Sequence, residues 1–477
     1  MAYDYDLVVL GVGPAGEKGA AQAAYYGKRV ACVEAARDPG GAAVHTGTLP
    51  SKTLRETALF LSGFRQRELY GLSVELNAAT AVPKLLSRKN AVVELEVARI
   101  KWNLERHGVP ILRGSARFVD PHTIELRGGE VASPTPRRIT SETFLVATGS
   151  RPHHPPDIPF DDEDVDDSDT ILQIDRLPKT MVVVGGGVIG CEYAAMFAAM
   201  RVGVTLIEGR PRLLQFLDEE IAERLRGAMQ ALGVTFLLGR TTKSVRRLDG
   251  RGIVTTLDDG TELDAEKVLA SSGRSGATAG LGLEALGVEV DKRGTVKVDG
   301  DFRTAVPNVY AAGDVIGFPA LASTSMEQAR VAVCHAFGFT YKQHVARLYP
   351  FGIYTIPEVG SVGLSEEGAR EAGREVVVGR AFYRDNARGK IVGDKDGVIK
   401  LVVDRSTRKV LGCHCIGERA SELVHIGQAV MLLEGTVDAF IDMVFNYPTL
   451  SEMFKYAAYD ALGTLAALAA TARPAPA

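Results

Sequence analysis

Residues 7–34, LVVLGVGPAGEKGAAQAAYYGKRVACVE, decide the fold of this chain. They predict an apolar strand, a glycine-rich turn, an alanine-rich helix, and a second strand over 29–33 that ends at an acid. Such a βαβ unit binds a dinucleotide, because the turn lets backbone N–H groups approach a pyrophosphate and the acid hydrogen-bonds a ribose. The residues expected to bind this first dinucleotide are Gly11, Gly13, Gly16 and Glu34.

The same pattern occurs again at residues 181–208, MVVVGGGVIGCEYAAMFAAMRVGVTLIE. The elements follow in the same order, and 23 residues separate the first glycine from the acid in both copies, from 11 to 34 and from 185 to 208. Two matched copies predict two dinucleotide sites and electron transfer between them, most simply as a hydride. The residues expected to bind the second dinucleotide are Gly185, Gly187, Gly190 and Glu208.

Composition narrows the class of protein. The chain has 477 residues, of which 46% are hydrophobic and 24% charged, as in globular proteins of about three domains. A formal net charge of −4 excludes the basic surface of a nucleic-acid-binding protein, and neither a membrane span nor a basic membrane-binding cluster is found. The five cysteines lack CxxC spacing, so no disulfide framework and no metal site is expected, and a cytoplasmic location is predicted.

The place of the second copy predicts the domain organisation. We expect a first dinucleotide-binding domain made of residues 1–150 and 276–345, with the second, 151–275, inserted into it. Residues 346–477 change pattern and predict an α+β domain, with strands at 398–403 and 410–416 and helices at 422–433 and 452–470. The predicted fold class is therefore α/β with two Rossmann-like domains, followed by a C-terminal α+β domain.

Three local features have simple structural interpretations. Eight acidic residues between Asp157 and Asp169 predict a solvated connection, since like charges repel in a packed interior. Trp102, in an apolar helical stretch, is expected in the core. Cys413 and Cys415 alternate along a strand and are expected to pack in the interior rather than bind a metal.

Four further segments carry a family resemblance: residues 40–52, GGAAVHTGTLPSK; residues 147–149, ATG; residues 313–314, GD; and residues 447–452, YPTLSE. Together they resemble the FAD-dependent pyridine nucleotide-disulfide oxidoreductases over nearly the whole chain. The resemblance implies FAD at the first site, NAD(H) or NADP(H) at the second, and a C-terminal domain that forms a homodimer or higher homo-oligomer. It places Lys52 near the flavin, paired with Glu192, as the catalytic pair. The further cofactor contacts that it implies are Gly41, Thr48, Thr148, Gly149, Gly273, Arg274, Gly313 and Asp314.

The departures from this family decide the expected activity. Where its disulfide reductases have two cysteines, this chain has Ala43 and Thr48, and where they have a histidine it has Tyr447. Neither Ala43 nor Thr48 can form a thiolate, so the disulfide half of the reaction is absent. The segments 45–52 and 445–449 are similar to members that transfer hydride between NADPH and NAD+ in a ping-pong cycle. Two alternatives are an NAD(P)H:quinone or dye reductase and, of another class, an NADH-binding interaction module.

Coenzyme selection depends on the residues after the second acid. Glu208 favours a free ribose hydroxyl and repels a 2′-phosphate, whereas Arg210 and Arg212 supply cations for that phosphate. We therefore expect both coenzymes to be used, with better binding of NAD(H). His45 is interpreted equally well as a residue that tunes the flavin and as a structural histidine.

Overall fold

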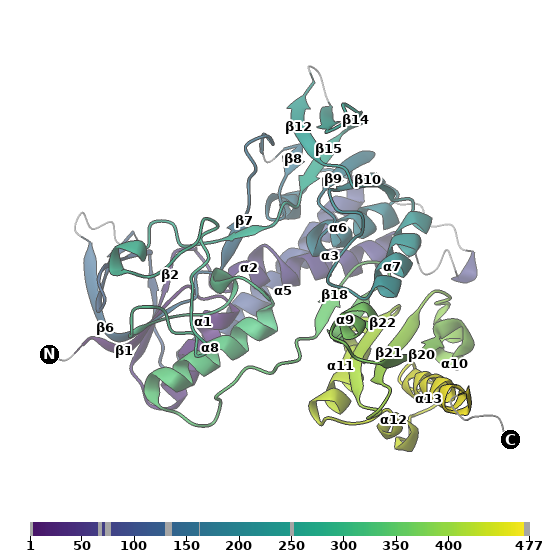
Figure 1. Ribbon diagram of the computed structural model, residues 1–477. Coiled ribbons are helices and arrows are strands. Elements are labelled where there is room, and N and C mark those ends of the chain that lie inside the picture. Colours follow the sequence, from purple (N-terminus) through teal and green to yellow (C-terminus); the bar gives the residue numbers. More distant parts are fainter. Residues whose placement is uncertain are drawn as a thin grey trace.

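The computed structural model describes residues 3–64, 69–71, 78–128, 136–161, 163–248 and 252–471, and it contains three main sheets (Figure 1). The first sheet has the order β3-β2-β1-β6-β5-β4, with β17 also paired to β6. Its parallel strands are β1 Tyr5–Leu10, β2 Val30–Glu34, β3 Ile111–Arg113, β6 Arg137–Val146 and β17 Val309–Ala311. The antiparallel pair β4 Ser115–Asp120 and β5 Thr123–Arg127 extends it. The predicted first βαβ unit is confirmed, with its helix α1 at Pro14–Tyr25.

The second sheet, at the top of Figure 1, is parallel throughout in the order β11-β10-β9-β15-β8. Its strands are β8 Val165–Asp166, β9 Thr180–Val184, β10 Gly203–Glu208, β11 Thr235–Leu238 and β15 Lys267–Ala270. Helix α6, Val188–Ala199, joins β9 to β10, and α7, Glu219–Ala231, follows β10. An antiparallel meander, β12 Thr242–Arg247, β13 Ile253–Leu257 and β14 Glu262–Ala265, extends the unit. The predicted repeat is therefore present in the fold.

The chain passes between these two sheets through one narrow ribbon. It leaves the first sheet after β6 through β7, Ser150–Pro152, and returns through β16, Arg274–Gly276, before β17. The two short strands pair antiparallel, with Arg274 opposite Pro152 and Gly276 opposite Ser150. The second dinucleotide unit is thus an insertion that begins and ends at the same place.

The last sheet is antiparallel, in the order β18-β19-β22-β21-β20. Its strands are β18 Phe351–Ile353, β19 Val359–Gly363, β20 Val376–Phe382, β21 Val398–Asp404 and β22 Val410–Ile416. The packed helices include α11 Ala420–Leu432, near the expected 422–433, and α13 Met453–Thr471, near the expected 452–470. Cys413 and Cys415 lie fully buried in β22, as predicted.

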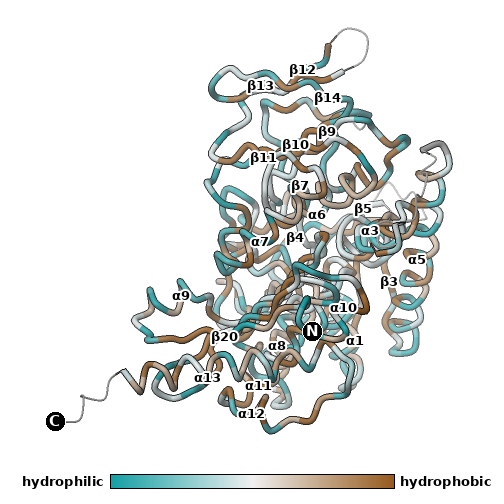
Figure 2. Tube along the Cα trace, turned by 90° about the vertical axis from the view of Figure 1, so that its right-hand side faces the viewer, coloured by the Kyte–Doolittle hydropathy of each residue, from teal (hydrophilic) through white to brown (hydrophobic). Residues whose placement is uncertain are grey.

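The remaining α-helices of the described ranges are α2 Gly41–His45, α3 Thr48–Leu61, α5 Ala78–Arg106, α8 Ala322–Phe337, α9 Glu366–Glu371, α10 Ala387–Val392 and α12 Asp438–Asp442. Of these, α3 packs against α5 and against α6 of the inserted unit. Strands β9 and β10 are largely brown in Figure 2, as expected for parallel strands covered on both faces. None of the helices in the described ranges is long and apolar enough to cross a membrane.

The expectation for Trp102 is wrong. Its side chain on α5 is 57% exposed, and Arg106, one turn further along, stacks over the indole ring at 4.5 Å. The buried apolar residues in this part of α5 are instead Val97, Ile100 and Leu104. A helix of 29 residues presents only one face to its neighbours, here mainly α1, α2 and α3, and Trp102 lies off the buried face.

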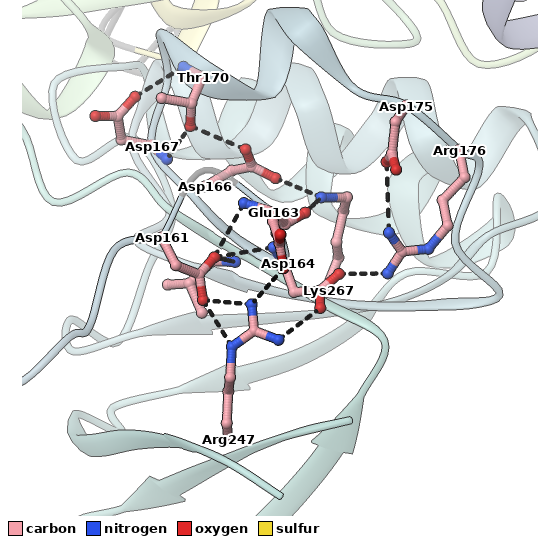
Figure 3. Close-up of polar contacts among 11 residues, drawn as sticks. Asp161, Glu163, Asp164, Asp166, Asp167, Thr170, Asp175, Arg176, Arg247 and Lys267 are labelled. Atoms are coloured by element: carbon pink, nitrogen blue, oxygen red, sulfur yellow. Dashed lines mark hydrogen bonds and ion pairs between the residues drawn. The ribbon is translucent and has the colours of Figure 1, made fainter. Parts of the chain in front are cut away.

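The acidic segment is not simply solvated, and the expectation for it is corrected. Asp166 and Asp167 are buried, and cations from the inserted unit pair with other carboxylates of the segment as well as with Asp166 (Figure 3). Lys267, itself 1% exposed, pairs with Asp166 at 2.9 Å. Arg247 pairs with Asp161 at 2.6 Å and with Asp164 at 3.1 Å. Asp161, Asp164 and Asp166 remain close together here because each pairs with a cation.

Candidate active site between two dinucleotide turns

The two glycine-rich turns have the same geometry. Gly11 and Gly185 have φ of 95° and 104°, which other residues rarely adopt, and each begins its turn at the end of a buried strand. A Cβ on Gly16 would lie 1.9 Å from the Gly11 carbonyl oxygen, and one on Gly190 would lie 1.9 Å from that of Gly185. Only glycine at positions 16 and 190 therefore permits each helix to begin this close to the preceding strand. The N–H groups of the first turn of each helix then point toward the glycine-rich turn.

The two acids are held in matching ways. Glu34, at the end of β2, accepts the N–H of Val12 at 2.9 Å and that of Ala36 at 2.9 Å. Glu208, at the end of β10, accepts the N–H of Gly186 at 2.7 Å and that of Arg210 at 2.9 Å. Both carboxylates are thus fixed beside their turns, where an adenosine ribose lies in dinucleotide-binding βαβ units.

The first turn continues into a cradle that suits FAD. A Cβ on Gly41 would lie 2.9 Å from the Cα of Gly13, so these two backbones approach this closely only because Gly41 bears no side chain. The Thr148 hydroxyl is buried and has no hydrogen-bond partner in the protein. A buried hydroxyl without a partner costs roughly 1–3 kcal/mol, which a polar ligand group removes. The residues present therefore fit the cofactor that the resemblance implies.

Gly149 and Gly313 close the same region. Their φ values are 73° and 84°, and they precede Ser150 and Asp314, whose side chains meet: the Ser150 hydroxyl donates to Asp314 Oδ2 at 2.8 Å. The Gly313 N–H donates to the Gln328 side chain at 2.9 Å. Segments far apart in the sequence thus assemble one polar wall of the first site.

Lys52 and Glu192 come together as expected. Lys52, on α3, places its Nζ 2.7 Å from Glu192 Oε2 on α6, so the pair bridges the two dinucleotide units. Glu192 is 8% exposed, and its Oε1 accepts the N–H of Tyr354 at 2.9 Å. The Tyr354 ring lies 5.0 Å from Lys52 Nζ, close enough for a cation–π contact. Burial raises the pKa of the Tyr354 phenol, so this ring is neutral beside the ammonium.

No thiol lies at the expected redox positions. Ala43 is in α2, and Thr48 is the first residue of α3, four residues before Lys52. All five cysteines are free and buried, and burial raises the pKa of Cys191, the neighbour of Glu192, well above its usual value. In α2, His45 Nε2 lies 2.9 Å from the Pro39 carbonyl oxygen, a contact that fixes the turn before α3.

The second site is open where a coenzyme would enter. A Cβ on Gly187 would meet nothing within 4 Å. The Arg210 side chain is exposed beside Glu208, whereas Arg212 is engaged with the Gln215 carbonyl oxygen at 3.2 Å and with Glu219 at 3.5 Å. Arg210 is thus the better placed of the two cations for a 2′-phosphate.

The sequence reasoning missed two residues. Tyr354 directly follows β18, and its N–H donates to Glu192. Ser150 joins Asp314 to the ribbon. The position of Ser150, directly after the glycine of residues 147–149, was a usable signal. Gly273 has φ of 94°, and the Arg274 side chain that follows it lies in the ribbon, bonded to Ser150 and to Asp169.

Two βαβ units with matched turns, joined by a lysine–glutamate pair, define an oxidoreductase that binds two dinucleotides. Residues 5–336 match the pyridine nucleotide-disulphide oxidoreductase family, and residues 349–458 match the dimerisation domain of the same family. The chain belongs to this family.

Curated relatives and solved structures agree with that assignment. The chain is 47% identical to a soluble pyridine nucleotide transhydrogenase of Mycobacterium tuberculosis, over 98% of this chain and 98% of that one. It is 39% identical to one of Klebsiella pneumoniae, over 97% of this chain and 99% of that one. The crystal structure of LpdA from Mycobacterium tuberculosis matches with a TM-score of 0.87 at 28% identity over 95% of this chain and 98% of that one. The HOCl-induced flavoprotein disulfide reductase RclA from Escherichia coli, in its Cu(II) complex, matches with a TM-score of 0.86 at 26% identity over 96% of this chain and 99% of that one.

Proposed function

We propose that this protein is an FAD-dependent enzyme that transfers hydride reversibly between NADPH and NAD+. The observation that carries the proposal is the combination of two complete dinucleotide sites with Ala43 and Thr48 at the positions of the missing cysteines. FAD, when bound, supplies the group that accepts and returns the hydride. The curated relatives named soluble pyridine nucleotide transhydrogenase, at 39–47% identity over nearly the full chain, support this function.

The chain's own residues have distinct roles in this proposal. The turn of Gly11, Gly13 and Gly16 with Glu34 holds the adenosine half of FAD, and Asp314 holds its ribityl chain. Lys52 presents a cation beside the flavin, and Glu192 fixes that ammonium at 2.7 Å. A fixed cation lowers the free energy of a reaction in which negative charge develops next to it.

Both nicotinamide coenzymes use one pocket in turn. The described residues contain one glycine-rich turn besides that assigned to FAD, at Gly185–Gly190, so NADP+ leaves before NAD+ enters. The reaction therefore follows ping-pong kinetics. Glu208 favours NAD(H), while the exposed Arg210 tolerates the phosphate of NADP(H).

The proposed organisation follows the sequence expectations: residues 1–150 and 276–345 bind FAD, 151–275 bind NAD(P), and 346–477 form the contact between subunits. The match of 349–458 to a dimerisation domain supports a homodimer or higher homo-oligomer. We place the enzyme in the cytoplasm.

The proposal is tested by giving the purified yellow protein NADPH with thio-NAD+, a quinone or oxidised lipoamide as parallel acceptors. Thio-NAD+ is expected to be reduced fastest, and lipoamide not at all, since that reaction needs a thiolate pair. Quinone reduction that exceeds thio-NAD+ reduction would instead identify a quinone reductase. Flavin reduction too slow for turnover with every acceptor would indicate an NADH-binding module.

A further inference from the structure

The ribbon between the two dinucleotide units is held by one guanidinium. Arg274, in the returning strand β16, donates from Nη2 to the Ser150 carbonyl oxygen at 2.9 Å in the departing strand β7. Its Nε donates to the Ser150 hydroxyl at 2.8 Å. The same side chain therefore binds both the backbone and the side chain of Ser150, which lies in the partner strand two positions before Pro152, the residue opposite Arg274.

The other edge of the guanidinium faces the inserted unit. Arg274 Nη1 donates to Asp169 Oδ1 at 2.9 Å and to the Ser168 hydroxyl at 3.1 Å. These residues follow β8 and precede β9, so they lie where the acidic segment enters the parallel sheet of the inserted unit. The guanidinium thus reaches both sides of the ribbon with rigid, planar geometry.

Ser150 extends this contact to the first dinucleotide site. Its hydroxyl accepts from Arg274 Nε and donates its single proton to Asp314 Oδ2 at 2.8 Å. A hydroxyl that accepts from a guanidinium is polarised and donates more strongly to a carboxylate. The chain Asp169–Arg274–Ser150–Asp314 is consequently continuous from one dinucleotide unit to the other.

We propose that Arg274 is a positioning residue that, through Ser150, orients the Asp314 carboxylate toward FAD and fixes the inserted unit relative to it. The inference rests on the proposed function for the identity of the ligand at Asp314. It assigns Arg274 to the ribbon rather than to direct contact with the nicotinamide coenzyme. One side chain then sets the relative placement of the two sites, and FAD affinity depends on a residue outside the FAD site.

The test uses the full-length protein, four single variants (Arg274→Met, Arg274→Lys, Ser150→Ala and Arg247→Met) and the double variant that combines Arg274→Met with Ser150→Ala. Arg247 is the matched control, because its guanidinium also pairs with the acidic segment, at Asp161 and Asp164 (Figure 3). Within the described residues it contacts neither Ser150 nor Asp314. The readout is the dissociation constant of FAD, from flavin fluorescence, with no nicotinamide coenzyme present. Thermal unfolding of each apoprotein checks that it folds.

Arg274→Met is expected to raise the dissociation constant of FAD about tenfold, which corresponds to about 1.4 kcal/mol. Ser150→Ala breaks the same chain and gives a similar rise. The double variant then exceeds the larger single effect by less than twofold, since both act through one contact. Arg274→Lys gives a smaller rise, because one ammonium reaches fewer of the acceptors. Arg247→Met leaves FAD affinity within about twofold, as expected for an exposed ion pair.

The proposal is overturned if Arg274→Met binds FAD within twofold of the native protein while its KM for NADPH rises, which would place Arg274 in the coenzyme pocket. An equal loss of FAD in Arg247→Met would also overturn it, since the effect would then be general loosening of the segment. Should Arg274→Met fail to fold, Ser150→Ala and Arg274→Lys decide the same question. FAD is titrated without NADPH or NAD+, so this binding test is independent of the thio-NAD+ assay. An unchanged FAD affinity overturns the role of Arg274, whereas failure of the native protein to reduce thio-NAD+ overturns the proposed function.

Discussion

Replacing Glu192 by glutamine probes the Lys52–Glu192 pair without changing its shape. Glu192 uses both oxygens, one for Lys52 Nζ at 2.7 Å and one for the Tyr354 N–H at 2.9 Å. The amide has a single oxygen, so it cannot accept both hydrogen bonds, and its NH2 group faces an ammonium that also only donates. Either the lysine or the Tyr354 backbone loses its acceptor.

The magnitude follows from the burial of the two side chains. Breaking a fully buried ion pair costs about 3–5 kcal/mol. Here the Lys52 side chain is 25% exposed, so water solvates the released ammonium and the loss is nearer that of one charged hydrogen bond, about 1.5–3 kcal/mol. If the loss falls on the transition state, flavin reduction by NADPH slows about 10- to 100-fold.

The assay is anaerobic stopped-flow absorbance of flavin reduction at saturating NADPH. Glu289→Gln is the matched control, because Glu289 pairs with Lys297 at 2.8 Å but both side chains are more than half exposed. The control should stay within about twofold of the native rate, as exposed pairs contribute 0–1 kcal/mol. A Glu192→Gln rate within twofold of native would refute the assignment of this pair to the reaction.

Four further outcomes are expected. Glu208→Ala should raise kcat/KM for NADPH relative to NADH about tenfold, because it removes the charge that repels the phosphate; an unchanged ratio would contradict this. Gly187→Ala should raise KM for both coenzymes and leave the thermal stability and FAD content unchanged, since its methyl enters open space where the pyrophosphate approaches; Gly227→Ala, equally open on α7, is the control. Thiol alkylation of the native protein should not lower the rate, because all five cysteines are buried, and inhibition in step with labelling would reveal a thiol step. Although burial raises it, backbone hydrogen bonds and Arg247 lower the pKa of Asp161 from 3.8 to about 2. The contribution of Asp161 to stability is therefore present above pH 4 and lost as the pH falls toward 2, and Arg247→Met should flatten this part of the acid-unfolding profile.

The two βαβ units were predictable because their determinants are local. Gly16 and Gly190 must lack a side chain for a helix to start against the strand. The atoms that impose this requirement belong to Gly11 and Gly185 in the same short stretch of sequence. The Lys52–Glu192 contact, between residues 140 positions apart, followed only from the family resemblance, and the structure confirms it.

Features that depend on distant partners were not predictable. Counting charges between Asp157 and Asp169 cannot reveal that Lys267, about 100 positions later, neutralises Asp166. Trp102 lies among apolar residues in sequence but off the buried face of its helix, and the phase of a 29-residue helix is set by what packs on it. The position of Ser150 after the glycine of residues 147–149 marks it as a candidate, but nothing in that segment indicates that its partner is Asp314, 164 positions away.

The central claim is that hydride enters and leaves through one nicotinamide pocket with no thiol between. Sequential-mixing stopped-flow tests it most directly: the holoenzyme is reduced anaerobically with one equivalent of NADPH and then mixed with NAD+. The oxidised flavin spectrum should return at least as fast as steady-state turnover, with NADH formed in equal amount to the NADPH consumed. Reoxidation by NAD+ slower than turnover, or uptake of four electrons per subunit rather than two, would contradict the account.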